Sequence, residues 1–215
     1  MSKALIFDLD GTLADTIYSI LDAIHPVFRE LNFPERSYDD VSRALGCNVH
    51  VLIERLVPGE YADDYDFVES IVKKYNAEYD NTYLSATLFD GIAEVVRELK
   101  RRGYLLAVLS NKTDRYVKDI VNKLFPDGEI TIAQGCTALP AKPDPTVPRL
   151  MAEQLGVSPE ECAFVGDSNV DVLTGINSGM RPIAVSWGYC DRETLVSTGP
   201  EIIINSPAEL LEIFK

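Results

Sequence analysis

The stretch ALIFDLDGT, residues 4–12, joins a short apolar run to two carboxylates and a glycine. The run is apolar on both faces, which is typical of a strand buried between helices in a parallel sheet. Asp8 and Asp10 follow the carboxyl end of that strand, the edge where open α/β sheets bind ligands. Gly11 lets the backbone approach a ligand closely. The stretch predicts an α/β fold with a ligand site at Asp8, although these residue types also form ordinary turns.

Further apolar runs of the same character follow along the chain. They occupy residues 104–109, 129–133, 162–165, 183–185 and 202–204. Helical patterns alternate with them, at residues 91–102, 145–155 and 169–178. This alternation predicts a doubly wound parallel sheet, that is, a Rossmann-like α/β core.

The region of residues 15–83 departs from this alternation, because it contains no convincing strand. Its helical patterns lie near residues 16–31, 38–45, 49–56 and 64–79. Pro26 is expected to kink or interrupt the first of these helices. We therefore predict an α-helical cap domain at residues 15–83, inserted into a core made of residues 1–14 and 84–215.

Composition and charge narrow the class of function. The 215 residues are 46% hydrophobic and 25% charged, which is ordinary for a soluble globular protein. No apolar run approaches the ~20 residues of a membrane span, and the four cysteines are scattered, so we expect a cytoplasmic protein without a membrane partner. The net charge of −14 argues against nucleic acid as a partner. A phosphorylated substrate would need a divalent cation and a nearby lysine.

Two further polar motifs, later in the chain, contain side chains that can bind a phosphate group. Ser110 and Asn111 end the second apolar run, and their hydroxyl and amide groups can donate hydrogen bonds to phosphate oxygens. Lys142 precedes a helix and can neutralise a phosphate as a compact charge. Taken alone, these residues also fit a polar helix start and a solvated lysine in a loop.

The motif GDSNVD, residues 166–171, follows the strand predicted at residues 162–165. Asp167 and Asp171 provide hard oxygen ligands of the kind that Mg²⁺ prefers, although either also suits the start of a helix. A parallel sheet would bring all four motifs to one edge. Together they supply a nucleophile, an acid/base, hydrogen-bond donors, a lysine and metal ligands, which is the equipment for phosphoryl transfer.

The ordered set D-x-D-G-T, S-N, K-P and G-D-x-x-x-D resembles the haloacid dehalogenase superfamily of phosphohydrolases. The helical insertion after the first strand resembles the subclass with a mobile α-helical cap. Within that subclass, the motif DGTLADT at residues 10–16 is most similar to phosphoglycolate phosphatases. The resemblance implies hydrolysis of small phosphate monoesters with Mg²⁺ as the cofactor, and 2-phosphoglycolate is the best single substrate.

The resemblance also implies a role for each motif residue. Asp8 would form an aspartyl-phosphate, and Asp10 would protonate the leaving group and later activate water. Mg²⁺ would be bound by Asp8, by the backbone carbonyl of Asp10 and by Asp167, with Asp171 close to the metal. The phosphoryl oxygens would be held by Ser110, Asn111 and Lys142.

The cap would close over the site and contact the leaving group of a small phosphorylated metabolite. Arg43, Gly46 and Asn48 are the candidates for substrate recognition. Arg43 can pair with a substrate carboxylate, although it also suits a solvated helix end.

Other functions use similar residues. A pyrophosphatase, a nucleotidase or a sugar-phosphate mutase of the β-phosphoglucomutase type would need the same motifs. A non-enzymatic phospho-receiver explains Asp8, Asp167 and Lys142, but it explains neither Asp10 nor the large insertion. A halide-releasing hydrolase is disfavoured by Asp10, because that carboxyl serves to protonate an alkoxide leaving group.

Overall fold

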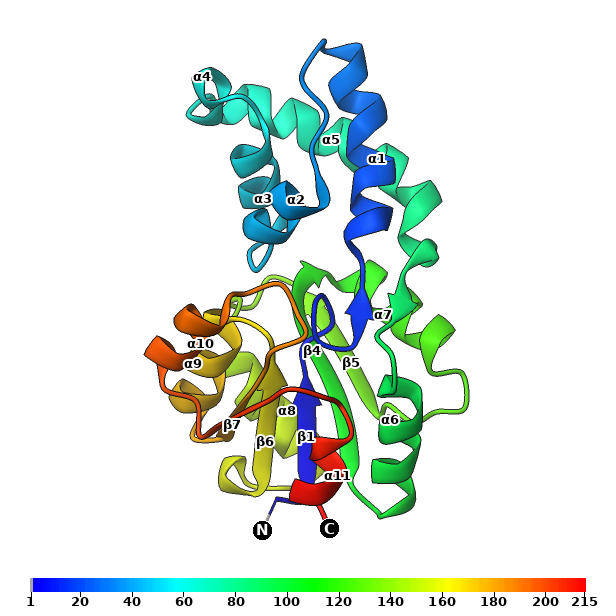
Figure 1. The fold of residues 1–215 in the computed structure, drawn as a ribbon, viewed down its shortest axis with the longest axis vertical. Helices are drawn as coiled ribbons and strands as arrows, with labels where there is room; N and C mark the ends of the chain where they lie inside the picture. Colours follow the sequence, from blue (N-terminus) through cyan, green and yellow to red (C-terminus); the bar gives the residue numbers. More distant parts are fainter. Residues whose placement is uncertain (1) are drawn as a thin grey trace. The chain divides into compact units, whose positions relative to one another are not determined.

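The computed structural model describes residues 2–215. The chain separates into two compact units, which are shown in Figure 1. The residues up to Ala14 and Leu88–Lys215 form one, called the core unit here. Asp15–Thr87 forms the other, called the helical unit.

The core unit is built on a six-stranded sheet with the order β5-β4-β1-β6-β7-β8. All neighbouring strands in it are parallel. Its strands are β1 (Ala4–Phe7), β4 (Leu105–Thr113), β5 (Ile132–Cys136), β6 (Cys162–Gly166), β7 (Arg181–Val185) and β8 (Ile202–Ile204). The predicted α/β fold with a parallel sheet is confirmed, although β5 begins three residues later than the start of the apolar run that predicts it.

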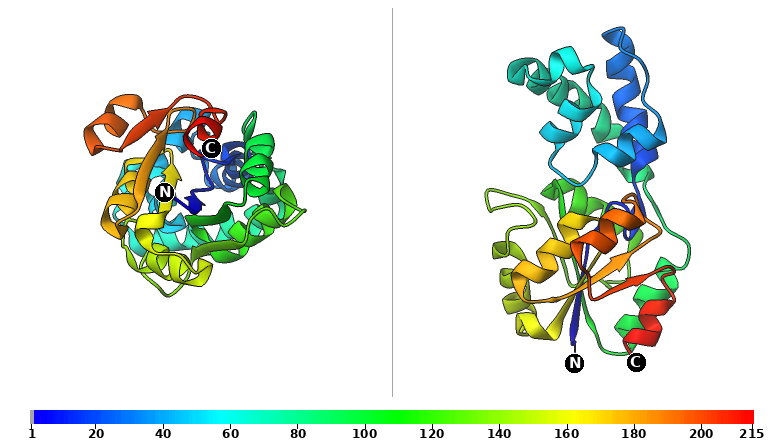
Figure 2. Two further views of the ribbon diagram at one scale, coloured as in Figure 1. Left: turned by 90° about the horizontal axis from the view of Figure 1, so that it is seen from below. Right: turned by 60° about the vertical axis from the view of Figure 1, so that its left-hand side comes forward.

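Helices lie on both faces of this sheet (Figure 2). They are α6 (Ile92–Arg101), α7 (Asp114–Leu124), α8 (Thr146–Leu155), α9 (Asn169–Ser178), α10 (Arg192–Thr198) and α11 (Glu209–Ile213). Met151 of α8 packs in a buried cluster with Ile6 and Phe164 of the sheet. Burial of such side chains contributes about 1.5–3 kcal/mol each, which explains why strands without a polar face lie in the middle of the sheet.

The register of the central strands sets the position of the polar residues that follow. Phe7 of β1 lies opposite Val108 of β4 and Val165 of β6. Asp8 therefore follows the end of β1 at the level of Gly166, the residue directly before Asp167. The register brings the motifs after these strands to one carboxyl edge.

The helical unit contains α1 (Ile17–Glu30), α2 (Tyr38–Ala44), α3 (Val49–Leu56), α4 (Gly59–Ala62), α5 (Tyr65–Thr82) and the short 3₁₀ helix η1 (Tyr83–Ser85). The chain segments that link the two units, β2 (Ala14–Asp15) and β3 (Thr87–Leu88), form a small two-stranded sheet. No sequence pattern predicts these strands, because two residues are too few to show a period. Within residues 2–215, every helix falls short of the length and apolar character that a membrane span requires.

Helix α1 continues through Pro26, so the proline does not interrupt the helix, which was one of the two outcomes expected of it. The proline removes one backbone hydrogen bond, but buried apolar side chains lie on both sides of it. Ile24, Val27 and Phe28 are almost fully buried. Their packing outweighs the cost of a proline inside a helix, which is about 3 kcal/mol.

Candidate active site

The first motif forms a tight loop at the carboxyl end of β1. The Asp8 amide donates to the carbonyl of Val165 at 2.9 Å, so the sheet hydrogen bonding continues into the site. The amides of Leu13 and Ala14 both donate to the carbonyl of Leu9, at 3.1 and 3.0 Å. This arrangement holds the Asp8 side chain, which is buried, at the sheet edge.

Three carboxylates meet at this edge. Asp8, Asp167 and Asp171 are all buried, and one carboxylate oxygen from each lies within 4.8 Å of the others. Asp8 follows β1, Asp167 follows β6, and Asp171 lies in the first turn of α9. The structure thus brings together the three side chains that were predicted to lie near the metal.

Lys142 lies between two of these carboxylates. Its Nζ atom is 2.7 Å from Asp8 Oδ1 and 2.7 Å from Asp171 Oδ1. The lysine side chain is 4% exposed, so it is not a solvated loop residue. Both ion pairs are buried, where an unpaired charge would be costly.

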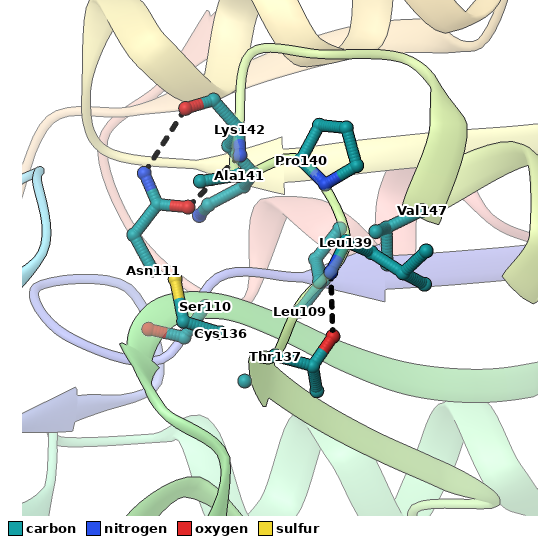
Figure 3. A pocket seen from close by; sticks show the side chains of 11 residues that line it. Leu109, Ser110, Asn111, Cys136, Thr137, Leu139, Pro140, Ala141, Lys142 and Val147 are labelled. Carbon is teal, nitrogen blue, oxygen red and sulfur yellow. Dashed lines mark hydrogen bonds between the residues drawn. The ribbon is translucent and has the colours of Figure 1, made fainter.

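Asn111 holds the backbone of Lys142 in place, as Figure 3 shows. Its Oδ1 accepts from the Lys142 amide at 2.9 Å, and its Nδ2 donates to the Lys142 carbonyl at 3.1 Å. Sequence reasoning missed this contact. Asn111 and Lys142 are 31 residues apart, and nothing in their two motifs indicates that the side chain of one hydrogen-bonds to the backbone of the other. In this structure the Asn111 amide thus positions the lysine that was expected to share phosphate binding with it.

The other two carboxylates are held by short polar contacts. The Thr12 hydroxyl donates to Asp167 Oδ1 at 2.9 Å, and the Tyr189 amide donates to Asp167 Oδ2 at 2.8 Å. Ser168 caps α9, and its hydroxyl donates to Asp171 Oδ2 at 2.5 Å. Asp171 therefore acts both in a helix capping box and in the acidic cluster.

Glycines allow the backbone to pack directly against these carboxylates. A Cβ atom at Gly11, where φ is +88°, would lie 2.3 Å from Asp167 Oδ2. A Cβ at Gly166 would lie 2.2 Å from Asp171 Cβ, and one at Gly188 would lie 2.3 Å from Asp167 Cβ. Any side chain at these three positions would displace the carboxylates.

The loop after β7 completes this side of the site. Trp187 Nε1 donates to the carbonyl of Thr12 at 3.0 Å. Trp187 and Tyr189 therefore connect the loop to both the first motif and Asp167. Sequence reasoning missed Gly188 and Tyr189, since their contributions come from backbone geometry rather than from side-chain chemistry.

Asp10 lies at the same edge in a different environment. Its Oδ1 atom is 2.7 Å from Lys112 Nζ, and the Ser110 hydroxyl is 3.4 Å from its Oδ2. The side chains of Lys112 and Asp10 are 10% and 12% exposed. Sequence reasoning gave no role to Lys112.

Crowding of the buried carboxylates changes their proton affinity. Burial raises the pKa of Asp8 well above its ordinary value; Lys142 opposes the rise, while Asp171 and Asp167 add to it. Burial and the charge of Asp171 raise the pKa of Asp167 to about 7. Burial disfavours the charged form of Lys142, but Asp171 and Asp8 outweigh it and raise the pKa of the lysine.

The residues fit a divalent cation. When ionised, the three clustered carboxylates carry three negative charges, and Lys142 supplies one positive charge, which leaves an excess of two. Carboxylate oxygens are hard ligands suited to Mg²⁺. A bound cation would remove the repulsion that opposes ionisation of Asp8 and Asp167.

The candidate recognition residues of the helical unit make local contacts. The Arg43 guanidinium lies 3.1 Å from Asp40 Oδ1. The Asn48 side chain accepts from the Val51 amide at 3.1 Å and caps α3. Gly46 has a φ of +98° in the connecting loop. Their role in substrate recognition stays a prediction.

A parallel α/β sheet with buried aspartates and a lysine at its carboxyl edge defines an enzyme suited to phosphoryl chemistry. The chain belongs to the haloacid dehalogenase-like hydrolase family, whose model matches residues 5–185.

Relatives with known names agree with this class. A phosphoglycolate phosphatase of Aquifex aeolicus (strain VF5) is 30% identical over 212 residues, covering 98% of this chain and 96% of the relative. Phosphoglycolate phosphatase 1 of Pseudomonas aeruginosa is 26% identical over 215 residues, covering 98% and 79%. The crystal structure of a predicted phosphoglycolate phosphatase from Haemophilus somnus 129pt has a TM-score of 0.89 and 25% identity, covering 100% of this chain and 98% of that one. The chain is a phosphatase of this family.

Proposed function

We propose that the protein is a Mg²⁺-dependent phosphatase that hydrolyses small phosphate monoesters, 2-phosphoglycolate first among them, through an aspartyl-phosphate on Asp8. The observation that carries the proposal is the buried cluster of Asp8, Asp167 and Asp171, in which Lys142 pairs with Asp8 and Asp171. The names of the similar phosphoglycolate phosphatases support the substrate.

Asp8, Asp167 and the backbone carbonyl of Asp10 would hold the metal, with Asp171 beside it. When bound, Mg²⁺ supplies positive charge that stabilises phosphoryl oxygens and lets an anionic nucleophile approach an anionic ester. Thr12 and Tyr189 keep Asp167 oriented toward the cluster. Such supporting hydrogen bonds orient a ligand before the metal arrives.

In the first step, an Asp8 carboxylate oxygen attacks phosphorus, and the bond from phosphorus to the ester oxygen breaks. The Asp10 carboxyl gives its proton to the departing alkoxide, which otherwise leaves poorly. In the second step, Asp10 takes a proton from water as the water oxygen attacks phosphorus. The acyl phosphate bond breaks, inorganic phosphate leaves and the Asp8 carboxylate is restored.

Lys142 stabilises the charge on the transferring group, because its ammonium already contacts Asp8 Oδ1. Ser110 and Asn111 are proposed to donate hydrogen bonds to the same group from the end of β4. Asn111 contributes in a second way, since its side chain holds the Lys142 backbone. In the helical unit, Arg43, Gly46 and Asn48 are proposed to recognise the leaving group.

Phosphate release from a panel of phosphorylated metabolites, with Mg²⁺ or with EDTA, tests the proposal. We expect 2-phosphoglycolate to give the highest kcat/KM and EDTA to abolish turnover reversibly. Turnover that persists in EDTA would refute the metal requirement. A sugar phosphate that is rearranged instead of hydrolysed, with a bisphosphate required, would identify a mutase.

A further inference from the structure

Lys112 is a partly buried cation, and the proposed mechanism assigns no role to its contact with the first motif. It lies near the end of β4, two residues after Ser110. Its Nζ atom contacts Asp10 Oδ1 at 2.7 Å, and both side chains are largely withdrawn from solvent. Solvent and salt screen an ion pair with so little exposure only weakly, so the pair fixes the positions of the two side chains relative to each other.

The second oxygen of Asp10 is oriented from the same strand. The Ser110 hydroxyl is 3.4 Å from Asp10 Oδ2, and the Lys112 amide donates to the Ser110 Oγ atom at 3.2 Å. Asp10, Ser110 and Lys112 therefore form a closed ring of contacts. The ring joins β4 to the first motif, and Ser110 and Asp10 are 100 residues apart in the chain.

We propose that Lys112 is a positioning residue that holds the Asp10 carboxyl group at the orientation required for proton transfer to the leaving group. This inference rests on the proposed function of Asp10. A group that transfers a proton must lie within about 2.6–3.2 Å of its target, and a misplacement of about 1 Å costs about 10²-fold in rate. A side chain held on both oxygens meets that requirement better than one held on neither.

A kinetic comparison of Lys112→Met with Lys112→Arg tests the role. The substrates are p-nitrophenyl phosphate, whose leaving group needs no proton, and glycerol 2-phosphate, an alkyl ester without a carboxylate. We expect Lys112→Met to lower kcat on the alkyl ester by about 10²-fold and on the aryl ester by less than about threefold, with KM nearly unchanged. Lys112→Arg should restore most of the loss, because a guanidinium can also pair with Asp10.

Lys118→Met is the matched control, since Lys118 forms an exposed ion pair with Asp114 at 2.6 Å on α7. It should leave both substrates unaffected. In an Asp10→Asn background, Lys112→Met should cause no further loss on the alkyl ester. Equal losses on both esters, a change confined to KM, or a full additional loss in that background would overturn the positioning role.

Equilibrium unfolding in urea separates this inference from the proposed function. The single variants Lys112→Met and Asp10→Asn and their double variant should show non-additive shifts of the urea midpoint, which reports the ion pair without any turnover. Additive shifts would overturn the pairing itself. Coupled shifts in a chain that hydrolyses none of the esters would instead refute the proposed function.

Discussion

The site of the core unit and the candidate residues of the helical unit are held in opposite ways. Asp8 and Lys142 are buried and separated by 134 residues in the chain. Arg43 is exposed, and its partner Asp40 is three residues away. Long-range contacts between buried charges are set by the whole fold, whereas short-range contacts on a helix are set locally. We therefore expect the proposed chemistry to depend on the core unit, and the candidate recognition residues to be replaceable without loss of that chemistry.

Asp8→Asn should produce the largest loss of activity. The carboxamide is a poor nucleophile, so turnover should fall on the order of 10⁴-fold or more. Phosphate release measures it, and circular dichroism should show an unchanged fold. Asp127→Asn, which alters an exposed aspartate of the core unit, should retain full activity. Substantial turnover in pure Asp8→Asn protein would remove Asp8 as the nucleophile.

Lys142→Met should produce the largest loss of stability. It leaves Asp8 and Asp171 buried without their cation, and breaking such a pair costs about 3–5 kcal/mol. Urea unfolding at neutral pH in EDTA measures the loss, which Mg²⁺ should partly offset. Lys118→Met breaks an exposed pair and should cost less than about 1 kcal/mol. Similar costs for the two lysines would contradict the contrast between buried and local contacts.

Arg43→Met should have an intermediate and selective effect. If Arg43 pairs with the substrate carboxylate, KM for 2-phosphoglycolate should rise about tenfold, because a charge-assisted hydrogen bond is lost. The kcat for p-nitrophenyl phosphate and the urea midpoint should stay nearly constant. A matching rise in KM for both substrates would argue against recognition of the carboxylate by this residue.

Glu98 gives the smallest predicted effect, and it is a dependence on pH. Hydrogen bonds from Arg101 and Arg102 hold the pKa of Glu98 at about 2, below its ordinary value of 4.5. Between these two pH values, the folded state therefore binds fewer protons at Glu98 than the unfolded state. The ionised Glu98 thus contributes to the free energy of unfolding above pH 4.5, and this contribution is lost as the pH falls toward 2. Glu98→Gln should flatten the decline of the urea midpoint over that range. An identical decline in both proteins would show that the contribution is absent.

Strand positions and the meeting of four motifs were predictable, because apolar runs locate buried strands and parallel strands end at one edge. The carboxylates of Asp8 and Asp167 accordingly meet where the sequence predicts. The contacts that hold the site were not predictable. Two examples are the hydrogen bonds from Asn111 to the Lys142 backbone and the ion pair between Lys112 and Asp10. Both depend on the conformation of loops, which the periodicity of the sequence does not predict.

Two departures from the local sequence signals have the same cause. Pro26 was expected to kink or interrupt its helix; the interruption does not occur, because tertiary packing around Ile24 and Phe28 outweighs the local preference. The strands β2 and β3 were not expected, since pairing between distant segments of two residues each leaves no pattern in either. Local signals located the elements, and non-local contacts decided the details.

Trp187 is the sole tryptophan of the chain, and its indole N–H is bonded to the carbonyl of Thr12. The Thr12 hydroxyl in turn contacts Asp167. The single tryptophan is therefore linked through the hydrogen bonds of Thr12 to a carboxylate of the acidic cluster. We expect tryptophan emission to give a label-free optical signal for rapid-mixing experiments, in which binding of Mg²⁺ at the proposed site and turnover are followed in real time.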